Sequence, residues 1–149
     1  MVQATPFLLV LSLALVAPSF SSRKCVLTGK WINDLGSNMT IGPMNEKGDF
    51  FGNYTTTVTV NKTETRTSPM LGSQHLTKEK SQPTFGFTVH WNFTDSVTVF
   101  TGQCFVDELG NEVLKTMWLL RLPENNINDD WKATMVGTNV FTRLHSQKE

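Results

Sequence analysis

Short runs of alternating apolar and polar residues recur along this chain and constrain its fold more than any other feature. Such alternation is typical of a strand with one buried face, and no stretch repeats apolar residues at the spacing of a helix. Turn residues such as Gly42-Pro43, Lys47-Gly48 and Gly110-Asn111 separate the runs. The pattern predicts eight strands, over residues 26–31, 38–41, 49–60, 68–75, 84–92, 96–107, 112–121 and 131–143. Because short connections favour sequential antiparallel pairing, we expect an all-β fold, an eight-stranded antiparallel up-and-down β-barrel.

The first residues have a different character. An uncharged apolar run over residues 7–17 is too short to span a bilayer, and Pro18 ends it. Ser19 and Ser21 then supply small residues at the positions that a signal peptidase reads. We therefore expect a secretory signal peptide over residues 1–21, a barrel domain over residues 22–149 and a secreted, extracellular protein. The alternative is a buried apolar strand at the N-terminus. The lack of alternating polar residues in this run argues against such a strand.

The expected secretion indicates the redox state of the cysteines. Cys25 and Cys104 are the two cysteines of the chain, and in an oxidising compartment two cysteines most simply form one disulfide. No CxxC or HxxxH pair accompanies them, so we expect no metal site.

The predicted strand over residues 112–121 is apolar on both faces, with Met117 and Leu119 on the outer one. Val136 and Val140 continue this outer face on the last predicted strand. Because a barrel covers only its inner face, we expect a subunit interface outside. The alternative is that these are scattered exposed apolar residues, which are common on protein surfaces.

Charge and motifs argue against several functions. The 13 Lys and Arg residues balance 13 Asp and Glu residues, which gives no electrostatic reason to expect a nucleic acid or a membrane surface as partner. The histidines His75, His90 and His145 lie in no recognisable nucleophile, metal or phosphate motif, and no GxSxG pattern occurs. Residues 128–130 lack the spacing, Gly and terminal Glu of a calcium loop, so we expect a solvated polar loop there. We expect neither enzyme activity nor a cofactor.

The binding of a small molecule has more support. The chain holds four tryptophans, and polar residues stand beside aromatic ones on predicted inner faces. Tyr54 shares a face with Thr56, and Phe100 shares one with Ser96 and Thr98. Polar side chains inside a barrel need hydrogen-bond partners, which a ligand could supply. An eight-stranded barrel is just wide enough for one such ligand.

The sequence also resembles the avidin family throughout the predicted mature chain. The residues that carry this resemblance are Lys24-Cys25, LTGKW over 27–31, NDLGSNMTIG over 33–42, QPTFGFTV over 82–89, TVFTGQCF over 98–105, EVLKTMWLLR over 112–121 and DDWKAT over 129–134. The resemblance implies a barrel, a homotetramer, and tight binding of one biotin per barrel without turnover.

The resemblance further implies roles for individual residues. The ureido oxygen of biotin would accept hydrogen bonds from Asn33, Ser37 and Tyr54, and the ureido N–H groups would donate to Thr56 and Asn139. The sulfur would touch Thr98, the rings would be walled by Trp91, Phe100 and Trp118, and a neighbouring subunit would supply Trp131. The tail and its carboxylate would meet Thr59, Val60, Asn61, Thr94 and Ser96.

The resemblance places Met117, Val136 and Thr138 at a subunit contact. Thr138 replaces an isoleucine of the family pattern, and a hydroxyl is less favourable there than an alkyl group, so we expect a softer contact. In the tail-binding loop Asn61 replaces a threonine.

Four Asn-x-Thr sequons could carry N-linked glycans, at Asn38, Asn53, Asn61 and Asn92. We expect Asn38 to be occupied. Asn53 and Asn92 each flank an inward-facing aromatic residue, so period two turns them outward. Asn61 lies in the loop expected to close over the ligand tail, so we expect it to be unmodified or only partly modified.

Two other functions remain open. A lipocalin-like carrier of an apolar ligand would lack the polar cluster of Asn33, Ser37 and Tyr54. A family member with the same fold could also have weakened or lost its biotin binding.

Overall fold

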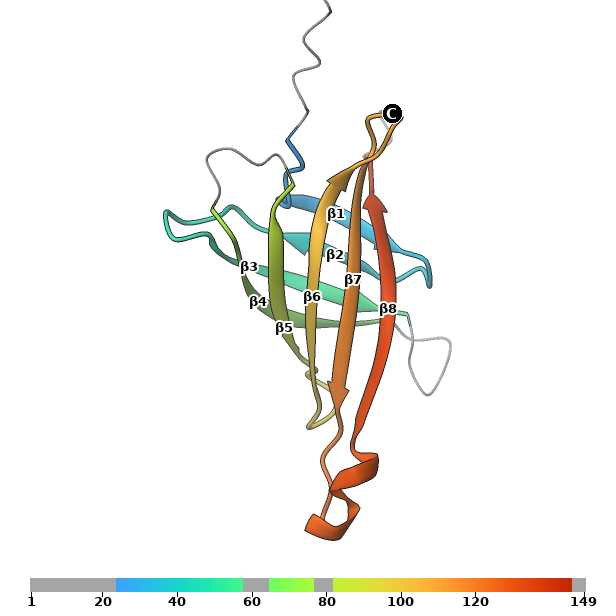
Figure 1. Ribbon diagram of the computed structural model, residues 1–149. Coiled ribbons are helices and arrows are strands. Elements are labelled where there is room, and N and C mark those ends of the chain that lie inside the picture. The colour runs from blue at the N-terminus through green and yellow to red at the C-terminus, as the bar shows by residue number, and fades with distance from the viewer. Residues whose placement is uncertain (1–23, 58–64, 77–81, 146–149) are drawn as a thin grey trace, which may run out of the picture.

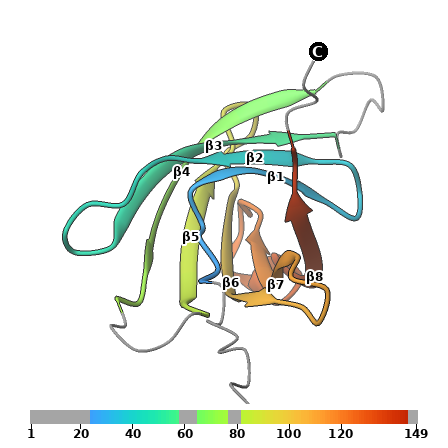
Figure 2. The ribbon, with the colours of Figure 1, turned by 90° about the horizontal axis from the view of Figure 1, so that it is seen from above.

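The computed structural model describes residues 24–57, 65–76 and 82–145. The elements are β1 (Gly29–Asn33), β2 (Asn38–Ile41), β3 (Asp49–Thr56), β4 (Arg66–Gln74), β5 (Thr84–His90), β6 (Val97–Val106), β7 (Glu112–Arg121), a 3-10 helix η1 (Ile127–Lys132) and β8 (Thr134–Arg143). Each strand pairs antiparallel with the next, and β8 pairs with β1 (Figure 1). The view from above shows the sheet closing on itself (Figure 2). The predicted fold class is confirmed. The predicted signal peptide, residues 1–21, lies outside the described residues.

The alternating sequence pattern explains most strand positions. β2 and β7 have the predicted bounds, and β4, β5 and β6 differ from prediction by one or two residues at their ends. Gly48 and Gly110 have φ angles of 86° and 81° and form two of the predicted turns. The third strand was predicted to residue 60; β3 ends at Thr56, and residues 58–60 lie outside the described residues. There the backbone N–H of Thr57 donates to Ser37 Oγ (3.1 Å).

The predicted start of the first strand, over residues 26–28, is wrong. β1 begins at Gly29, and the preceding segment is not paired as a strand. Leu27 is fully buried, and the indole N–H of Trp31 donates to its carbonyl oxygen (2.8 Å). Burial of Leu27 in the core therefore takes precedence over ladder pairing for this segment.

The predicted start of the last strand, at Trp131, is also wrong. Trp131 belongs to η1, which projects beyond the barrel between β7 and β8 (Figure 1). Asn126 caps this helix, since its side-chain oxygen accepts from the Asn128 N–H (2.9 Å). Residues 128–130, expected in a loop, are thus helical but not buried. Within the described ranges, no helix is long and apolar enough to cross a membrane.

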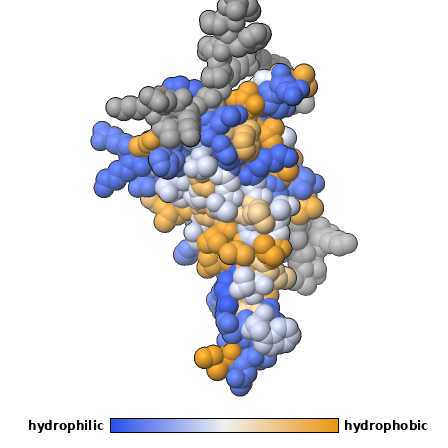
Figure 3. Space-filling view, in the orientation of Figure 1, coloured by the Kyte–Doolittle hydropathy of each residue, from blue (hydrophilic) through white to orange (hydrophobic). Residues whose placement is uncertain are grey.

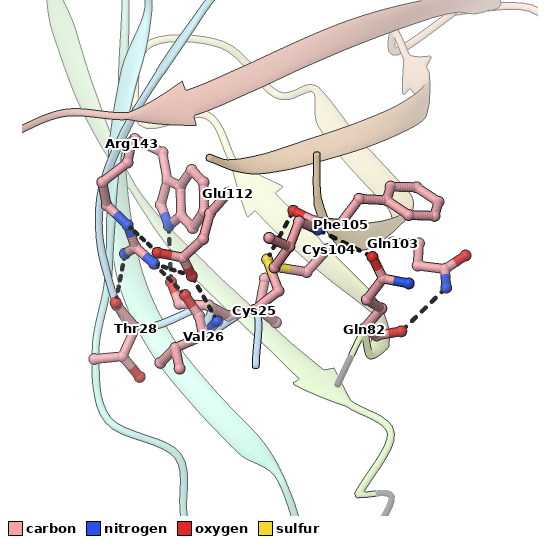
Figure 4. Close-up of a disulfide and its surroundings, with 12 residues drawn as sticks. Cys25, Val26, Thr28, Gln82, Gln103, Cys104, Phe105, Glu112 and Arg143 are labelled. Carbon is pink, nitrogen blue, oxygen red and sulfur yellow. Dashed lines mark hydrogen bonds and ion pairs between the residues drawn. A yellow bond between two sulfur atoms is a disulfide. The ribbon is translucent and has the colours of Figure 1, made fainter. Parts of the chain in front are cut away.

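The end of the barrel that holds the N-terminal segment is closed by a disulfide and an ion pair (Figure 4). Cys25 is bonded to Cys104, as predicted. The Arg143 guanidinium lies 4.0 Å from the ring centre of Trp31 and 2.7 Å from Glu112 Oε2. The same carboxylate oxygen accepts from the Val26 N–H (2.7 Å). These contacts hold the N-terminal segment across this end of the barrel.

The outer face of β6–β8 is apolar. Val99, Leu119 and Val136 lie side by side across the three strands, with 42%, 48% and 65% of their surfaces exposed. In the next row Met117 pairs with Thr138, and both are exposed. Figure 3 shows hydrophobic surface over the middle of this face. β7 therefore carries apolar side chains on both faces, as its sequence predicted.

Candidate ligand-binding site

A cavity of about 260 Å³ lies at the end of the barrel opposite the disulfide. It is formed by inner-face side chains of five strands and by the loops after β1, β5 and β7. The lining residues are Asn33, Leu35, Ser37, Tyr54, Thr56, Trp91, Phe93, Thr94, Ser96, Thr98, Phe100, Trp118, Leu120, Leu122 and Asn139. The period-two pattern placed most of the strand residues among them on inner faces.

Asn33 organises the polar part of this lining. Its side-chain oxygen accepts from the N–H groups of Leu35 (3.0 Å) and Ser37 (2.9 Å), which shapes the loop between β1 and β2. Its amide nitrogen donates to the Tyr54 hydroxyl (3.2 Å), so the proton of that hydroxyl is available to a ligand. Burial raises the pKa of Tyr54 above its ordinary value, so the phenol stays a neutral donor.

Asn139 lies on β8, the strand next to β1, and Asp34 holds its side chain. Its amide nitrogen donates to Asp34 Oδ1 (2.9 Å), which leaves the amide oxygen of Asn139 as an acceptor. The Asn139 hydrogen bond also holds the pKa of the Asp34 carboxyl below its ordinary value, so Asp34 is ionised at neutral pH. The lining thus presents hydrogen-bond donors and, from the neighbouring strand β8, an oriented acceptor.

Aromatic side chains wall the rest of the cavity. The Tyr54 ring stacks on Phe100 at 5.6 Å between centroids and meets Trp91 edge-on at 5.5 Å. The indole N–H of Trp91 donates to Thr98 Oγ1 (2.8 Å), which fixes the plane of the indole. Trp118 completes the wall from β7. Such a space suits a compact ring system with a polar edge.

Some predicted contact residues are not among the described lining residues. Thr59, Val60 and Asn61 lie outside the described residues. Trp131 is 82% exposed on η1 and does not line the cavity of its own chain.

Sequence reasoning missed Leu35, Phe93, Leu120 and Leu122 as lining residues. Leu120 was recognisable, because it shares the inner face of β7 with Trp118. The other three lie in loops, where alternation carries no information. Sequence reasoning also missed the support that Asp34 gives to Asn139, since the two residues are 105 positions apart.

The chemistry of the lining is neutral, with amide, hydroxyl, aromatic and aliphatic groups. Elsewhere, Cys25, Cys104 and Glu112 bring three potential metal ligands within 4.8 Å of one another. Both sulfurs are consumed by the disulfide, so they cannot act as thiolate ligands.

Comparison with known proteins assigns the family. The sequence profile described as the Avidin family matches residues 21–144. The chain belongs to the avidin family. Avidin of Gallus gallus is 62% identical over 152 residues, covering 100% of both chains. Avidin-related protein 4/5 of Gallus gallus is 64% identical over 142 residues, covering 95% of this chain and 93% of the relative.

Solved structures agree with this assignment to the avidin family. A biotin binding protein from chicken has a TM-score of 0.77 and 54% identity, covering 83% of this chain and 100% of its own. Xenavidin has a TM-score of 0.76 and 52% identity, covering 82% of this chain and 100% of its own. Avidin-family proteins are binding proteins, so this chain is not an enzyme.

Proposed function

We propose that this protein is a secreted, high-affinity biotin-binding protein that sequesters biotin without turnover. One observation carries the proposal: the hydrogen-bonded cluster of Asn33, Ser37 and Tyr54 lies beside the oriented acceptor of Asn139 in an aromatic-walled cavity. Biotin presents a carbonyl oxygen flanked by two N–H groups on a compact bicyclic ring, which is the complementary pattern. The buried polar cluster argues against a carrier of purely apolar ligands, because such a ligand would offer no acceptor to the Tyr54 hydroxyl proton.

The residues predicted to contact biotin have the following roles in this proposal. Asn33, Ser37 and Tyr54 donate to the ureido oxygen, and Thr56 and Asn139 accept from its N–H groups. Thr98 touches the sulfur, and Trp91, Phe100 and Trp118 wall the rings. Thr94 and Ser96 meet the tail, together with Thr59, Val60 and Asn61. Because hydrogen bonds already hold several of these groups, the ligand orders little on arrival, which favours tight binding.

Titration with biotin tests the function directly. We expect one biotin per chain by calorimetry, and weaker binding in Tyr54→Phe by roughly 1–2 kcal/mol, because the ureido oxygen loses one donor. Thr67→Val is the matched control, since it removes one hydroxyl from the exposed end of β4, where Thr67 Oγ1 contacts Thr55 Oγ1 (2.9 Å). An absence of binding heat, together with no competition against labelled biotin, contradicts the proposal.

We further propose a homotetramer in which the apolar outer face of β6–β8 is covered by other subunits, with Met117, Val136 and Thr138 at a contact. Trp131, exposed on η1, reaches the cavity of a neighbour. Thr138→Ile should strengthen assembly by about 1 kcal/mol for each contact, because it buries an alkyl group in place of a hydroxyl.

Sedimentation at micromolar concentration measures the oligomeric state. Dilution of the wild type and of Thr138→Ile then compares how readily each tetramer dissociates. Thr67→Ile introduces the same side chain on β4, away from Met117 and Val136, and should leave dissociation unchanged. A wild-type monomer that binds biotin contradicts the tetramer.

Secretion and N-linked glycosylation complete the proposal. Asn38 on β2 is half-buried, and Asn53 on β3 is exposed. The register pairs Asn38 with Thr55 and Thr40 with Asn53, so two sequons lie side by side on the outer face. Asn92 is exposed after β5. Glycans on β2 and β3 leave the apolar face of β6–β8 clear for subunit contacts. Asn61, proposed to be unmodified or partly modified, lies outside the described residues.

A further inference from the structure

The neutral lining leaves one part of the proposed ligand without a charged partner. Biotin ends in a carboxylate, which is ionised at neutral pH. Removing an ionised carboxylate from water is unfavourable unless donors or a cation face it. The described lining offers hydroxyl groups near the open end, at Thr94 and Ser96, but no cation. A cation at the rim of the cavity would therefore favour the ionised tail.

Arg66 stands at this rim. Across the β3–β4 ladder, Tyr54 pairs with Ser68 and Thr56 pairs with Arg66. Tyr54, Ser68 and Thr56 are buried on the inner face of the barrel. Because residues two apart on a strand share a face, Arg66 occupies the next inner-face position, at the open end of β4.

An aromatic ring of the lining holds the guanidinium near the cavity. Arg66 Cζ lies 5.7 Å from the ring centroid of Phe93. Phe93 lines the cavity, and its ring centroid lies 5.8 Å from that of Trp91. This cation–π contact places the positive charge of the guanidinium beside the cavity, where it attracts a carboxylate.

Two carboxylates at this end increase the need for a cation, whereas Arg121 and Lys132 at the same end are paired with Asp130 and Asp129. Asp34 is ionised and engaged with Asn139 (2.9 Å). Asp95 is exposed in the turn after β5, between Thr94 and Ser96, whose hydroxyls contact each other. These two carboxylates repel an anionic tail, and Arg66 offsets that repulsion.

We propose that Arg66 is a specificity-determining residue, which makes the cavity prefer a ligand with an anionic tail over the same ligand with a neutral tail. This inference rests on the proposed biotin site. It adds that the open end of the cavity selects ligands by the charge of their tail. The effect is electrostatic, so it weakens as salt screens the charges.

The test compares biotin with biotinamide, in which a neutral carboxamide replaces the carboxylate. Competition against labelled biotin gives both affinities for the wild type, Arg66→Gln and Arg66→Lys. Arg66→Gln should lower the ratio of biotin to biotinamide affinity by about two- to five-fold, the effect of one partly exposed charge pair. At low salt, Arg66→Gln should also associate with biotin more slowly than the wild type does. Arg66→Lys should restore most of the ratio.

Lys47→Gln is the matched control, since it removes one positive charge at the exposed turn between β2 and β3, at the closed end. It should leave the ratio unchanged. If Arg66→Gln lowers the affinities for biotin and biotinamide by the same factor, or changes neither affinity, the assignment of Arg66 is overturned while the biotin site stands. If the wild type binds neither ligand, the proposed function itself is overturned, and the inference falls with it.

Discussion

Replacing Gly137 by alanine should lower the affinity for biotin by about 100-fold or more while the barrel still folds. Gly137 on β8 pairs with Trp118 on β7. A methyl group at Gly137 would collide with Cζ2 of the Trp118 indole, and would lie 2.6 Å from its Cε2 and 2.9 Å from its Cη2. The ladder hydrogen bonds hold the two backbones, so the indole must turn instead. The free space that can accept it is the 260 Å³ cavity.

The displaced indole would occupy volume that the bicyclic ring needs, and overpacking would lower the free energy of unfolding by about 1–3 kcal/mol. Calorimetry with biotin and urea unfolding measure the two effects separately. Gly86→Ala is the control, because a methyl group there meets only the backbone oxygen of Phe100, at 3.2 Å. Wild-type affinity in Gly137→Ala, or an equal loss in both variants, would rule out this explanation.

Replacing both Cys25 and Cys104 by alanine should lower the free energy of unfolding by about 4–5 kcal/mol, as an upper figure from the chain-entropy model. The disulfide joins residues 79 positions apart, so it removes much conformational freedom from the unfolded chain. In the folded state the N-terminal segment keeps other contacts. Arg143 still donates to the Thr28 carbonyl (2.7 Å), and Glu112 still accepts from the Val26 N–H (2.7 Å).

The double variant should therefore fold and keep its affinity for biotin, since the cavity lies at the opposite end. Urea unfolding with and without reductant supplies the control. Reductant should bring the wild type to the stability of the double variant, and should not affect the double variant. Equal unfolding midpoints for the two oxidised proteins would show that the cross-link contributes little.

The sequence by itself determined the fold class, because the alternation of apolar and polar residues is a local signal that each strand carries independently. β2 and β7 were predicted with correct bounds, since turn residues or a change of pattern mark both of their ends. The same alternation identified the inward side chains Tyr54 and Phe100, and the apolar outer face around Met117. The assignment of individual contacts to biotin came from the family resemblance and remains a proposal.

Only the tertiary structure decided how these local signals combine. The burial of Leu27 removes residues 26–28 from β1, and the capping of η1 by Asn126 removes Trp131 from β8. Neither event follows from alternation, because each depends on packing or on side-chain hydrogen bonds to the backbone. The cavity depends still more on register, which brings Arg66 to the rim and Asn139 to Asp34. Such contacts join residues far apart in the chain, so they exist only once the barrel has closed.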